Sequence, residues 1–374
     1  MKYWGAFVAA CLIACGSNGA DDSSGTDAGT DASVGQDSAS KDGSQTTDGS
    51  GKDGSQQGCG TCPTGYTCGS ANGAPVCRSS TTQIPLFTNV FVILMENTTL
   101  ATLETGVNGN KAPNLKTWQG QYATAADYHG VAHPSLPNYI ALTSGGTQGI
   151  GCDCGAAPGK GTCYPVLDVC LTCSCNQATT GHLADQLEAA NKTWMDFGED
   201  MGTPCNLTDS GNYVTRHNPF LYYDNVQTNA SRCTTHVVDY KNFDPNKPAT
   251  FNFIAPNLID DMHNPDPPDS TNIPNGDAWL GKNVPPILAS SAYKAGGLLV
   301  IVWDEDDGSG GIDGTTDDPV GIWVFSPFAK SGGFVAKSHY DHYSLLATFE
   351  DGLDLGRIGK AAQATPLNEF FPAN

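Results

Sequence analysis

Continuous apolar runs at residues 90–94 and 298–303 dominate the hydrophobic pattern of the chain. Apolar runs without alternation are typical of strands buried on both faces, as in a parallel sheet. Weaker strand patterns cover residues 250–255 and 320–325. Helical spacing of apolar residues separates these runs in four ranges, which are 135–142, 182–191, 277–293 with a break at Pro285 and Pro286, and 342–353. The alternation predicts an α/β fold with a mainly parallel central sheet and helices on both faces.

The chain before this sheet has a different pattern. Residues 1–15 carry Lys2 and then a short apolar run that cannot span a bilayer, which is typical of a secretory signal. The end of this segment resembles the bacterial lipobox, which implies cleavage before Cys15 and a lipid anchor on Cys15. An ordinary signal peptide with an incidental cysteine is the alternative. Residues 16–57 are Gly, Ser, Asp and Thr with almost nothing apolar, so we expect a disordered tether.

Residues 58–80 form a third part, ahead of a large domain over 81–374. They hold Cys59, Cys62, Cys68 and Cys77 in a Gly/Pro-rich run. Four cysteines in a short exported segment predict a small disulfide-rich module with two disulfides in one of three connectivities. A thioredoxin-like redox motif is the alternative, but no βαβ pattern surrounds the Cys-x-x-Cys spacing.

The large domain contains eight further cysteines, for which disulfides are again the expected state. Cys205 and Cys233 flank a loop and are disulfide candidates. The other six form a cluster whose tight spacings leave zinc binding open as the alternative: Cys152, Cys154, Cys163, Cys170, Cys173 and Cys175.

The formal net charge of −21 limits the partners of the protein. A nucleic-acid backbone or an anionic lipid headgroup requires a cationic surface, so we expect neither as the bound partner. A single anionic group held by a metal ion remains compatible with this charge, because the ion reverses the local field.

Acidic and amide side chains follow the two strongest strand patterns. Glu96 and Asn97 come after one run, and Asp304 and Glu305 directly after the other. Parallel sheets bind ligands at the carboxyl ends of their strands, and clustered carboxylates repel unless a cation neutralises them. Asp304 and Glu305, directly after a buried strand, are therefore predicted metal ligands, and Glu96 and Asn97 are expected at the same edge of the sheet. An EF-hand does not fit, because Thr315 occupies the twelfth position counted from Asp304.

Ser135 lies between two prolines at the start of a predicted helix. Proline is tolerated near a helix start, where free backbone N–H groups face a neighbouring oxygen. The hydroxyl is therefore either a helix cap or a nucleophile beside an anion site. Asp306 and Asp307 are expected in a solvated acidic turn, Asp341 as a helix cap, and His182 and His236 at the surface.

Five ordered motifs resemble the phosphoesterase family of bacterial phospholipases C and bacterial and fungal acid phosphatases: VILMEN (92–97), HPSLPNY (133–139), RHNPF (216–220), DMH (261–263) and VWDE (302–305). That family is similar in fold to the alkaline phosphatase superfamily. The resemblance implies that Ser135 is the nucleophile and that its oxygen joins Glu96, Asn97, Asp304 and Glu305 around the metal. It also implies that histidines hold phosphate oxygens or protonate the leaving group: His133, His217, His263 and, with a less clear match, His342. His129 is a plausible neighbour of this group.

The expected function is that of a metal-dependent acid phosphatase, which acts on small phosphomonoesters through a phosphoserine and uses one or more divalent ions. A phospholipase C or other phosphodiesterase is the alternative within the same chemistry. A non-catalytic, surface-binding lipoprotein is the alternative of a different class. The arginine of the sulfatase signature is replaced by Tyr139, which argues against sulfate-ester cleavage. The signal and the lipobox predict an exported bacterial lipoprotein that is anchored to a membrane.

Overall fold

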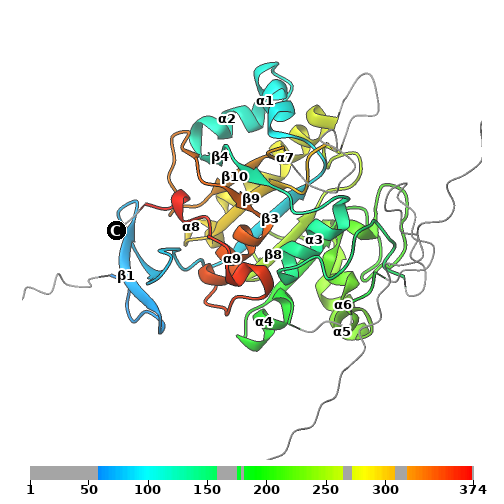
Figure 1. Ribbon diagram of the computed structural model, residues 1–374, viewed down its shortest axis with the longest axis horizontal. Helices are drawn as coiled ribbons and strands as arrows, with labels where there is room; N and C mark the ends of the chain where they lie inside the picture. The colour runs from blue at the N-terminus through cyan, green and yellow to red at the C-terminus, as the bar shows by residue number, and fades with distance from the viewer. Residues whose placement is uncertain (1–57, 158–174, 178–180, 264–271, 308–317, 373–374) are drawn as a thin grey trace, which may run out of the picture. The chain divides into compact units, whose positions relative to one another are not determined.

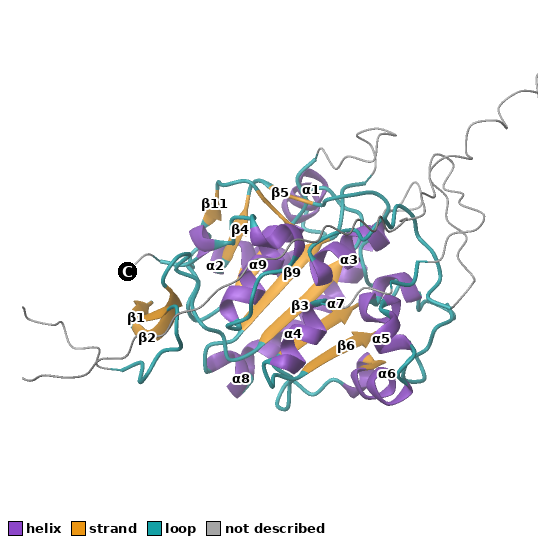
Figure 2. Ribbon diagram, turned by 60° about the horizontal axis from the view of Figure 1, so that its bottom comes forward, coloured by secondary structure: helices purple, strands orange, loops and turns teal. Residues whose placement is uncertain are grey.

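The two strongest apolar runs form adjacent parallel strands, β3 (Val90–Met95) and β9 (Leu298–Trp303), at the centre of the sheet. Every residue of both strands is buried. Their register pairs Val90 with Leu298 and Met95 with Trp303, so the two strands end side by side. The ends of both strands therefore lie at one edge of the sheet, as Figure 2 shows.

The computed structural model describes residues 58–157, 175–177, 181–263, 272–307 and 318–372. The predicted signal, the tether and three cysteines of the cluster (Cys163, Cys170 and Cys173) lie outside these residues. The described residues belong to one unit, Gly54–Asn374. None of the helices in this part of the chain has the length and apolar character needed to cross a membrane.

The central sheet has eight strands among the described residues, in the order β11-β4-β10-β9-β3-β8-β6-β7. Neighbouring strands are parallel except at β10, which runs antiparallel to both β9 and β4. The weaker strand predictions correspond to β8 and β10, and the mainly parallel sheet is confirmed. The remaining bounds are β4 Ala123–Ala125, β6 Trp194–Gly198, β7 Val237–Asp239, β8 Phe251–Ala255, β10 Ile322–Phe325 and β11 Val335–Ala336.

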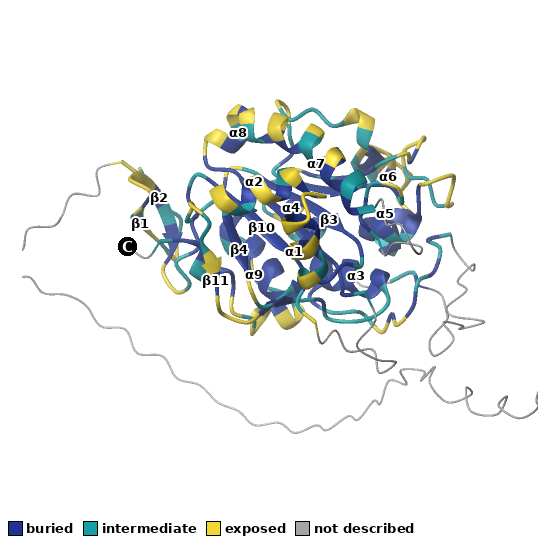
Figure 3. Ribbon diagram, turned by 90° about the horizontal axis from the view of Figure 1, so that it is seen from above, coloured by how far each residue is buried: buried dark blue, intermediate teal, exposed yellow. Residues whose placement is uncertain are grey.

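Helices cover both faces of this sheet, with α7 and α8 on one side and α3 and α9 on the other (Figure 3). The predicted helices are α3 (Ser135–Ser144), α4 (Leu183–Ala189), α7 (Asn272–Ala289) and α9 (His342–Gly352). Figure 1 also shows short helices that the pattern did not predict: α1 Leu100–Asn108, α2 Pro113–Gln121, α5 Asp224–Gln227 and α6 Ala230–His236. The end of the predicted range 277–293 belongs to a separate short helix, α8 Ser291–Lys294.

The predicted break at Pro285 and Pro286 is wrong, because α7 continues through both prolines to Ala289. Proline removes a helix hydrogen bond, but packing of the apolar face supplies most of the stability of a helix in a protein. Val284 and Ile287 on either side of the prolines are fully buried, which holds this last part of α7 against the core.

The cysteine-rich segment forms an antiparallel hairpin of β1 (Tyr66–Ala71) and β2 (Ala74–Ser79). Its two disulfides, Cys59–Cys68 and Cys62–Cys77, select one of the three connectivities. The two cysteines of the Cys-x-x-Cys spacing bond to different partners, which contradicts the redox alternative. The Tyr66 hydroxyl donates a hydrogen bond to the Asp351 carbonyl, so the hairpin contacts the end of α9.

Disulfides also account for the described cysteines of the large domain. Cys205 bonds to Cys233, as predicted, and Cys154 bonds to Cys175. Cys152 is disulfide-bonded as well. The described members of the cluster are therefore in the disulfide state that was expected first.

Candidate active site

Buried carboxylates meet where β3 and β9 end. Glu96 and Asn97 follow β3, Asp304 and Glu305 follow β9, and the Asp304 N–H donates a hydrogen bond to the Met95 carbonyl at 3.0 Å. Glu96, Asp304 and Glu305 are each at most 1% exposed. The parallel pairing of the two strands thus brings together all four predicted ligands, although more than 200 residues separate the two pairs in sequence.

The hydroxyl of Ser135 points into this group. Its Oγ lies 2.9 Å from Glu96 Oε2, 3.1 Å from Glu305 Oε1 and 3.3 Å from Asn97 Oδ1. Ser135 is the first residue of α3 after the cap residue Pro134, and its side chain does not cap the helix, whose Leu136 N–H donates to Asp153 Oδ1 at 2.9 Å. The cap alternative is therefore wrong. A hydroxyl can donate only one hydrogen bond, so at least two of these three oxygens face Oγ without receiving its proton.

The loop that carries Ser135 is fixed by Asn138, one turn into α3. Its Oδ1 accepts hydrogen bonds from the N–H groups of Val131 and Ala132 at 2.8 and 3.1 Å, and its Nδ2 donates to the Ala132 carbonyl at 2.7 Å. The peptide bond before Pro134 is cis. Asn138 was not among the predicted site residues, although its place in the HPSLPNY motif was a signal.

His133 lies between two acidic side chains. Its Nδ1 is 2.5 Å from Glu305 Oε2 and its Nε2 is 3.1 Å from Asp306 Oδ1. Burial lowers the pKa of His133, but the hydrogen bonds and charges of Glu305 and Asp306 outweigh burial and raise it above its ordinary value. Asp306 is fully buried, so its expected place in a solvated turn is wrong. Its proximity to His133 depends on tertiary contacts that the local pattern does not encode.

His217 contacts Glu96 at Oε1, the carboxylate oxygen that Ser135 does not contact. Its Nε2 lies 3.0 Å from Glu96 Oε1 and its Nδ1 3.9 Å from Asp261 Oδ2, and its ring stacks on Tyr139. The Tyr139 hydroxyl donates to Glu96 Oε1 at 2.6 Å. Burial raises the pKa of Glu96, but the charges of His217 and His263 and these hydrogen bonds outweigh burial and lower it to about 2. Glu96 is therefore held as a carboxylate, and its neighbours Tyr139 and Asp261 were not among the predicted site residues.

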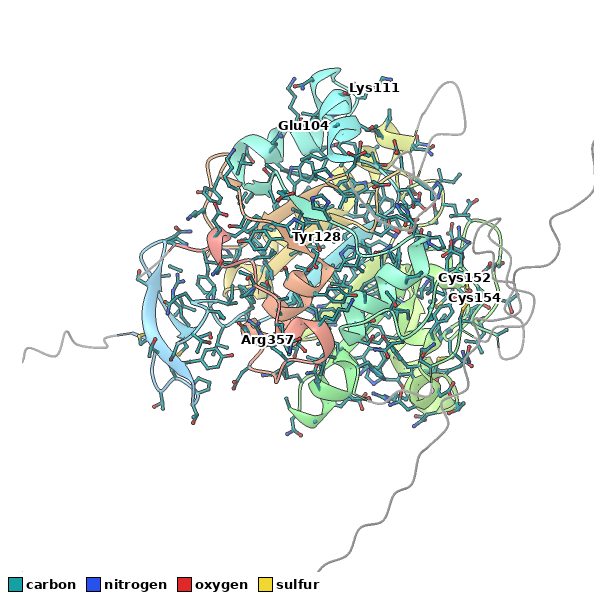
Figure 4. All side chains as sticks on the ribbon, in the orientation of Figure 1. Glu104, Lys111, Tyr128, Cys152, Cys154 and Arg357 are labelled. Carbon is teal, nitrogen blue, oxygen red and sulfur yellow. A yellow bond between two sulfur atoms is a disulfide. The ribbon has the colours of Figure 1, made fainter. Side chains whose placement is uncertain are left out.

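His342 is buried at the start of α9. Its Nε2 donates to the Asp304 carbonyl at 2.6 Å, and its Nδ1 accepts from the hydroxyl of Tyr128, labelled in Figure 4, at 2.9 Å. Burial lowers the pKa of His342 to about 4, so the ring is neutral at neutral pH. Both nitrogens contact the protein, which makes His342 a support for Asp304 in this structure. Asp341 caps α9, as expected.

Two histidines outside this group were expected at the surface. His182 is instead fully buried, where its ring stacks on Tyr223 and its Nε2 lies 2.9 Å from Asn225 Oδ1. His236 is partly exposed and stacks on Trp194. The aromatic residues that cover His182 are distant in sequence, so no local pattern indicated its burial.

The family model described as the Phosphoesterase family matches residues 88–356. The chain belongs to the Phosphoesterase family. The matched range includes Ser135, the four predicted ligands and all four predicted catalytic histidines, whereas the disulfide-bonded hairpin lies outside it. The family description fixes the class of reaction as hydrolysis of phosphoric esters.

Curated proteins that are similar to this chain are named as phosphatases. The chain is 29% identical over 290 residues to a phosphatidylinositol-3-phosphatase of Mycobacterium tuberculosis. This match covers 77% of this chain and 84% of that protein. It is 25% identical over 262 residues to an acid phosphatase of Aspergillus fumigatus, covering 66% of this chain and 52% of that protein. A solved protein of the alkaline phosphatase superfamily from Vibrio parahaemolyticus is similar with a TM-score of 0.49 and 10% identity, covering 85% of this chain and 76% of that chain.

The acidic group of this phosphoesterase fits a divalent cation. Burial, together with the charges of Glu96 and Glu305, raises the pKa of Asp304 well above its ordinary value, and burial raises the pKa of Glu305 to about 7. Asp304 Oδ2 is buried and has no hydrogen-bond partner among the residues that the structure describes. A bound cation would neutralise the repulsion between these carboxylates and would give Asp304 Oδ2 a partner. Carboxylate, amide and hydroxyl oxygens are the donors that hard divalent ions prefer.

Proposed function

We propose that this member of the Phosphoesterase family is a metal-dependent phosphatase that hydrolyses phosphomonoesters, with Ser135 as the nucleophile. One observation carries the proposal: the Ser135 hydroxyl is surrounded by oxygens of Glu96, Asn97 and Glu305 at 2.9–3.3 Å. A lone serine hydroxyl is a weak nucleophile and needs a base or a metal ion. The same oxygens that would hold the ion would also direct the hydroxyl.

The residues that would hold the ion are Glu96, Asn97, Asp304 and Glu305. When bound, a divalent ion lowers the pKa of the hydroxyl and neutralises charge on the phosphoryl group. Ser135 Oγ then forms a bond to phosphorus while the bond from phosphorus to the leaving oxygen breaks. The hydroxyl proton passes to a neighbouring base, and water later hydrolyses the phosphoserine to release inorganic phosphate and restore the serine.

His133 is suited to serve as the acid for the leaving oxygen. It stays protonated to a higher pH than an isolated histidine, because Glu305 and Asp306 raise its pKa. His217 and His263 lie near Glu96 and are proposed to hold phosphate oxygens. His342, whose two nitrogens contact Asp304 and Tyr128, is proposed to position Asp304.

A preference for monoesters is supported by the names of the curated relatives, which are acid phosphatases and a phosphatidylinositol-3-phosphatase. The test is to compare hydrolysis of p-nitrophenyl phosphate with that of p-nitrophenyl phosphorylcholine, with and without a chelator. We expect the monoester to be the better substrate and the chelator to remove the activity, with recovery on adding a divalent ion.

Each other result points to a specific alternative. Preferential cleavage of the choline diester would favour a phospholipase C or another phosphodiesterase. Full activity after chelation and dialysis would contradict the metal. An inactive wild-type protein that is folded and metal-loaded would favour the non-catalytic, surface-binding lipoprotein.

A further inference from the structure

A second group of potential ligands contains His129, which was expected beside the catalytic histidines and instead contacts Asp127 and His339. His129 Nε2 is 2.6 Å from Asp127 Oδ1, and His339 Nδ1 is 3.3 Å from Asp127 Oδ2. The two imidazole rings are also neighbours, with centroids 4.9 Å apart. One carboxylate thus has a histidine beside each of its oxygens, although about 210 residues of sequence separate His339 from the other two.

The backbone holds these three side chains together. His129 belongs to β5 (Tyr128–His129), which pairs in parallel with β12 (Tyr340–Asp341). The N–H of Tyr340 donates to the Asp127 carbonyl at 2.9 Å. Asp127 and His339 each directly precede one of the two strands, so the pairing of β5 with β12 brings their side chains to one place.

We propose that Asp127, His129 and His339 bind a transition-metal ion of the zinc class, at a site separate from the oxygen-rich site around Ser135. Two imidazoles and a carboxylate are a typical ligand set for such an ion, whereas the four predicted ligands around Ser135 are all oxygen donors. The ligand atoms of the three residues lie within 4.8 Å of one another. Ligands of a tetrahedral zinc ion lie ~3.3 Å apart at bond lengths of about 2.0–2.1 Å, so small side-chain rotations would suffice.

A bound ion would link β5, which precedes the loop that carries Ser135, to β12, which precedes α9. β5 is followed by the loop that carries Ser135, and β12 is followed directly by His342. The His339 side chain is 66% exposed and that of Asp127 is 41% exposed, so the remaining coordination positions can hold water. The site would therefore act as a structural clamp at this edge of the molecule.

Zinc binding to the purified full-length protein tests this proposal. Equilibrium dialysis against Zn²⁺ with excess Ca²⁺ and Mg²⁺, followed by metal analysis, gives the zinc content per chain. Wild-type protein should bind one more equivalent of zinc than His339→Ala or Asp127→Asn, with at least a ~10-fold loss of affinity in each variant. His236→Gln, which removes a partly exposed histidine from α6, serves as the matched control and should keep the wild-type content.

A second readout follows from linkage, because an ion that binds only the folded state stabilises it. Zinc should raise the thermal unfolding midpoint of the wild type and of His236→Gln, and should raise that of His339→Ala less. Because the His339 side chain is exposed, its alanine variant should keep the fold, which circular dichroism checks. Equal zinc contents in wild type and His339→Ala, no zinc uptake by the wild type, or the same loss in His236→Gln would each overturn the proposal.

Discussion

Glu96 receives hydrogen bonds at both of its carboxylate oxygens. Oε1 accepts from the Tyr139 hydroxyl at 2.6 Å, and Oε2 accepts from Ser135 at 2.9 Å. If Glu96 holds a metal ion, Tyr139 orients that ligand without touching the ion. Contacts of this kind contribute to metal affinity because they fix the geometry of the ligand.

Tyr139→Phe should therefore weaken binding of the activating metal by about 10–100-fold. The ring remains to stack on His217, so the fold should be kept. The measurement is the metal concentration needed to restore half of the phosphatase activity after chelation. Tyr223→Phe is the matched control, since it removes another buried hydroxyl, which contacts Thr143 at 2.7 Å. Equal metal requirements in the two variants would contradict a supporting role for Tyr139.

Glu350 is a buried carboxyl outside the active site. Its Oε1 accepts from the Ile358 N–H at 2.9 Å, while its Oε2 is buried without a partner among the described residues. Burial raises the pKa of Glu350 from its ordinary value of 4.5 to about 8. Between these two pKa values the folded state keeps a proton on Glu350 that the unfolded state loses. The contribution of Glu350 to the free energy of unfolding therefore falls as pH rises from about 4.5 to about 8.

Glu350→Gln should remove this part of the pH dependence. Relative to wild type, the variant should gain stability across that window, by up to about 1.4 kcal/mol for each pKa unit between the two states. Urea unfolding at pH 5 and pH 8 measures the difference. The comparison with wild type cancels other titrating groups, so parallel stability profiles would show that Glu350 is ionised in the folded protein.

The place of a single site residue was predictable where its position in the sequence fixes its position in the fold. Residues that directly follow two buried strands had to meet if the strands were parallel neighbours, and Glu96, Asp304 and Glu305 do meet. Asp306 and His182 were not predictable in this way. Their burial depends on His133 and Tyr223, which reach them only through the tertiary fold.

At the scale of elements, the loop between β5 and α3 depends on one side chain. Asn138 accepts from two N–H groups of this loop and donates to the carbonyls of Ala132 and Pro134. A buried donor that loses its partner costs about 1–3 kcal/mol, so the loop should move without Asn138.

Asn138→Ala should therefore lower kcat by at least ~10-fold, because a small displacement of a reacting group lowers the rate steeply. Steady-state kinetics with p-nitrophenyl phosphate measure the change in kcat. Thermal unfolding measures the change in stability separately. Asn283→Ala, which removes an amide that donates to the Trp279 carbonyl within α7, is the control. Unchanged kcat in Asn138→Ala would show that the loop holds its position without this side chain.

The long elements followed from the hydrophobic pattern, and the short ones did not. β3 and β9 are buried on both faces and gave unbroken apolar runs. β5 and β12 have two residues each, too few for any periodicity, and they form only because distant segments pair. The same limit applies to the end of α7, where burial of Val284 and Ile287 outweighs the helix-breaking tendency of two prolines.

At the scale of the whole molecule, the match to the Phosphoesterase family covers residues 88–356 and leaves the N-terminal region to be explained by itself. We propose that this region exports and anchors the enzyme, with Cys15 as the lipid-bearing residue. The proposal rests on the lipobox resemblance of the segment before Cys15. The hairpin at 58–80 would then lie between the tether and the catalytic domain in the chain.

Cys15→Ala should release the protein from membranes when it is produced in a bacterium that processes lipoproteins. The measurement is the distribution between the detergent and aqueous phases of a Triton X-114 partition. Cys11→Ala, which removes the other cysteine of the predicted signal, should leave the distribution as in wild type. A Cys15→Ala protein that remains in the detergent phase would contradict the anchor.

The most direct measurement is detection of phosphate on Ser135 during turnover. Wild-type protein is mixed with p-nitrophenyl phosphate and divalent metal, quenched rapidly in acid and digested, and the peptide containing Ser135 is analysed by mass spectrometry. We predict a phosphate on Ser135 that is absent when the metal is removed, and a Ser135→Ala variant that is folded and binds metal but does not turn over. Turnover by Ser135→Ala at the wild-type rate would contradict the central claim.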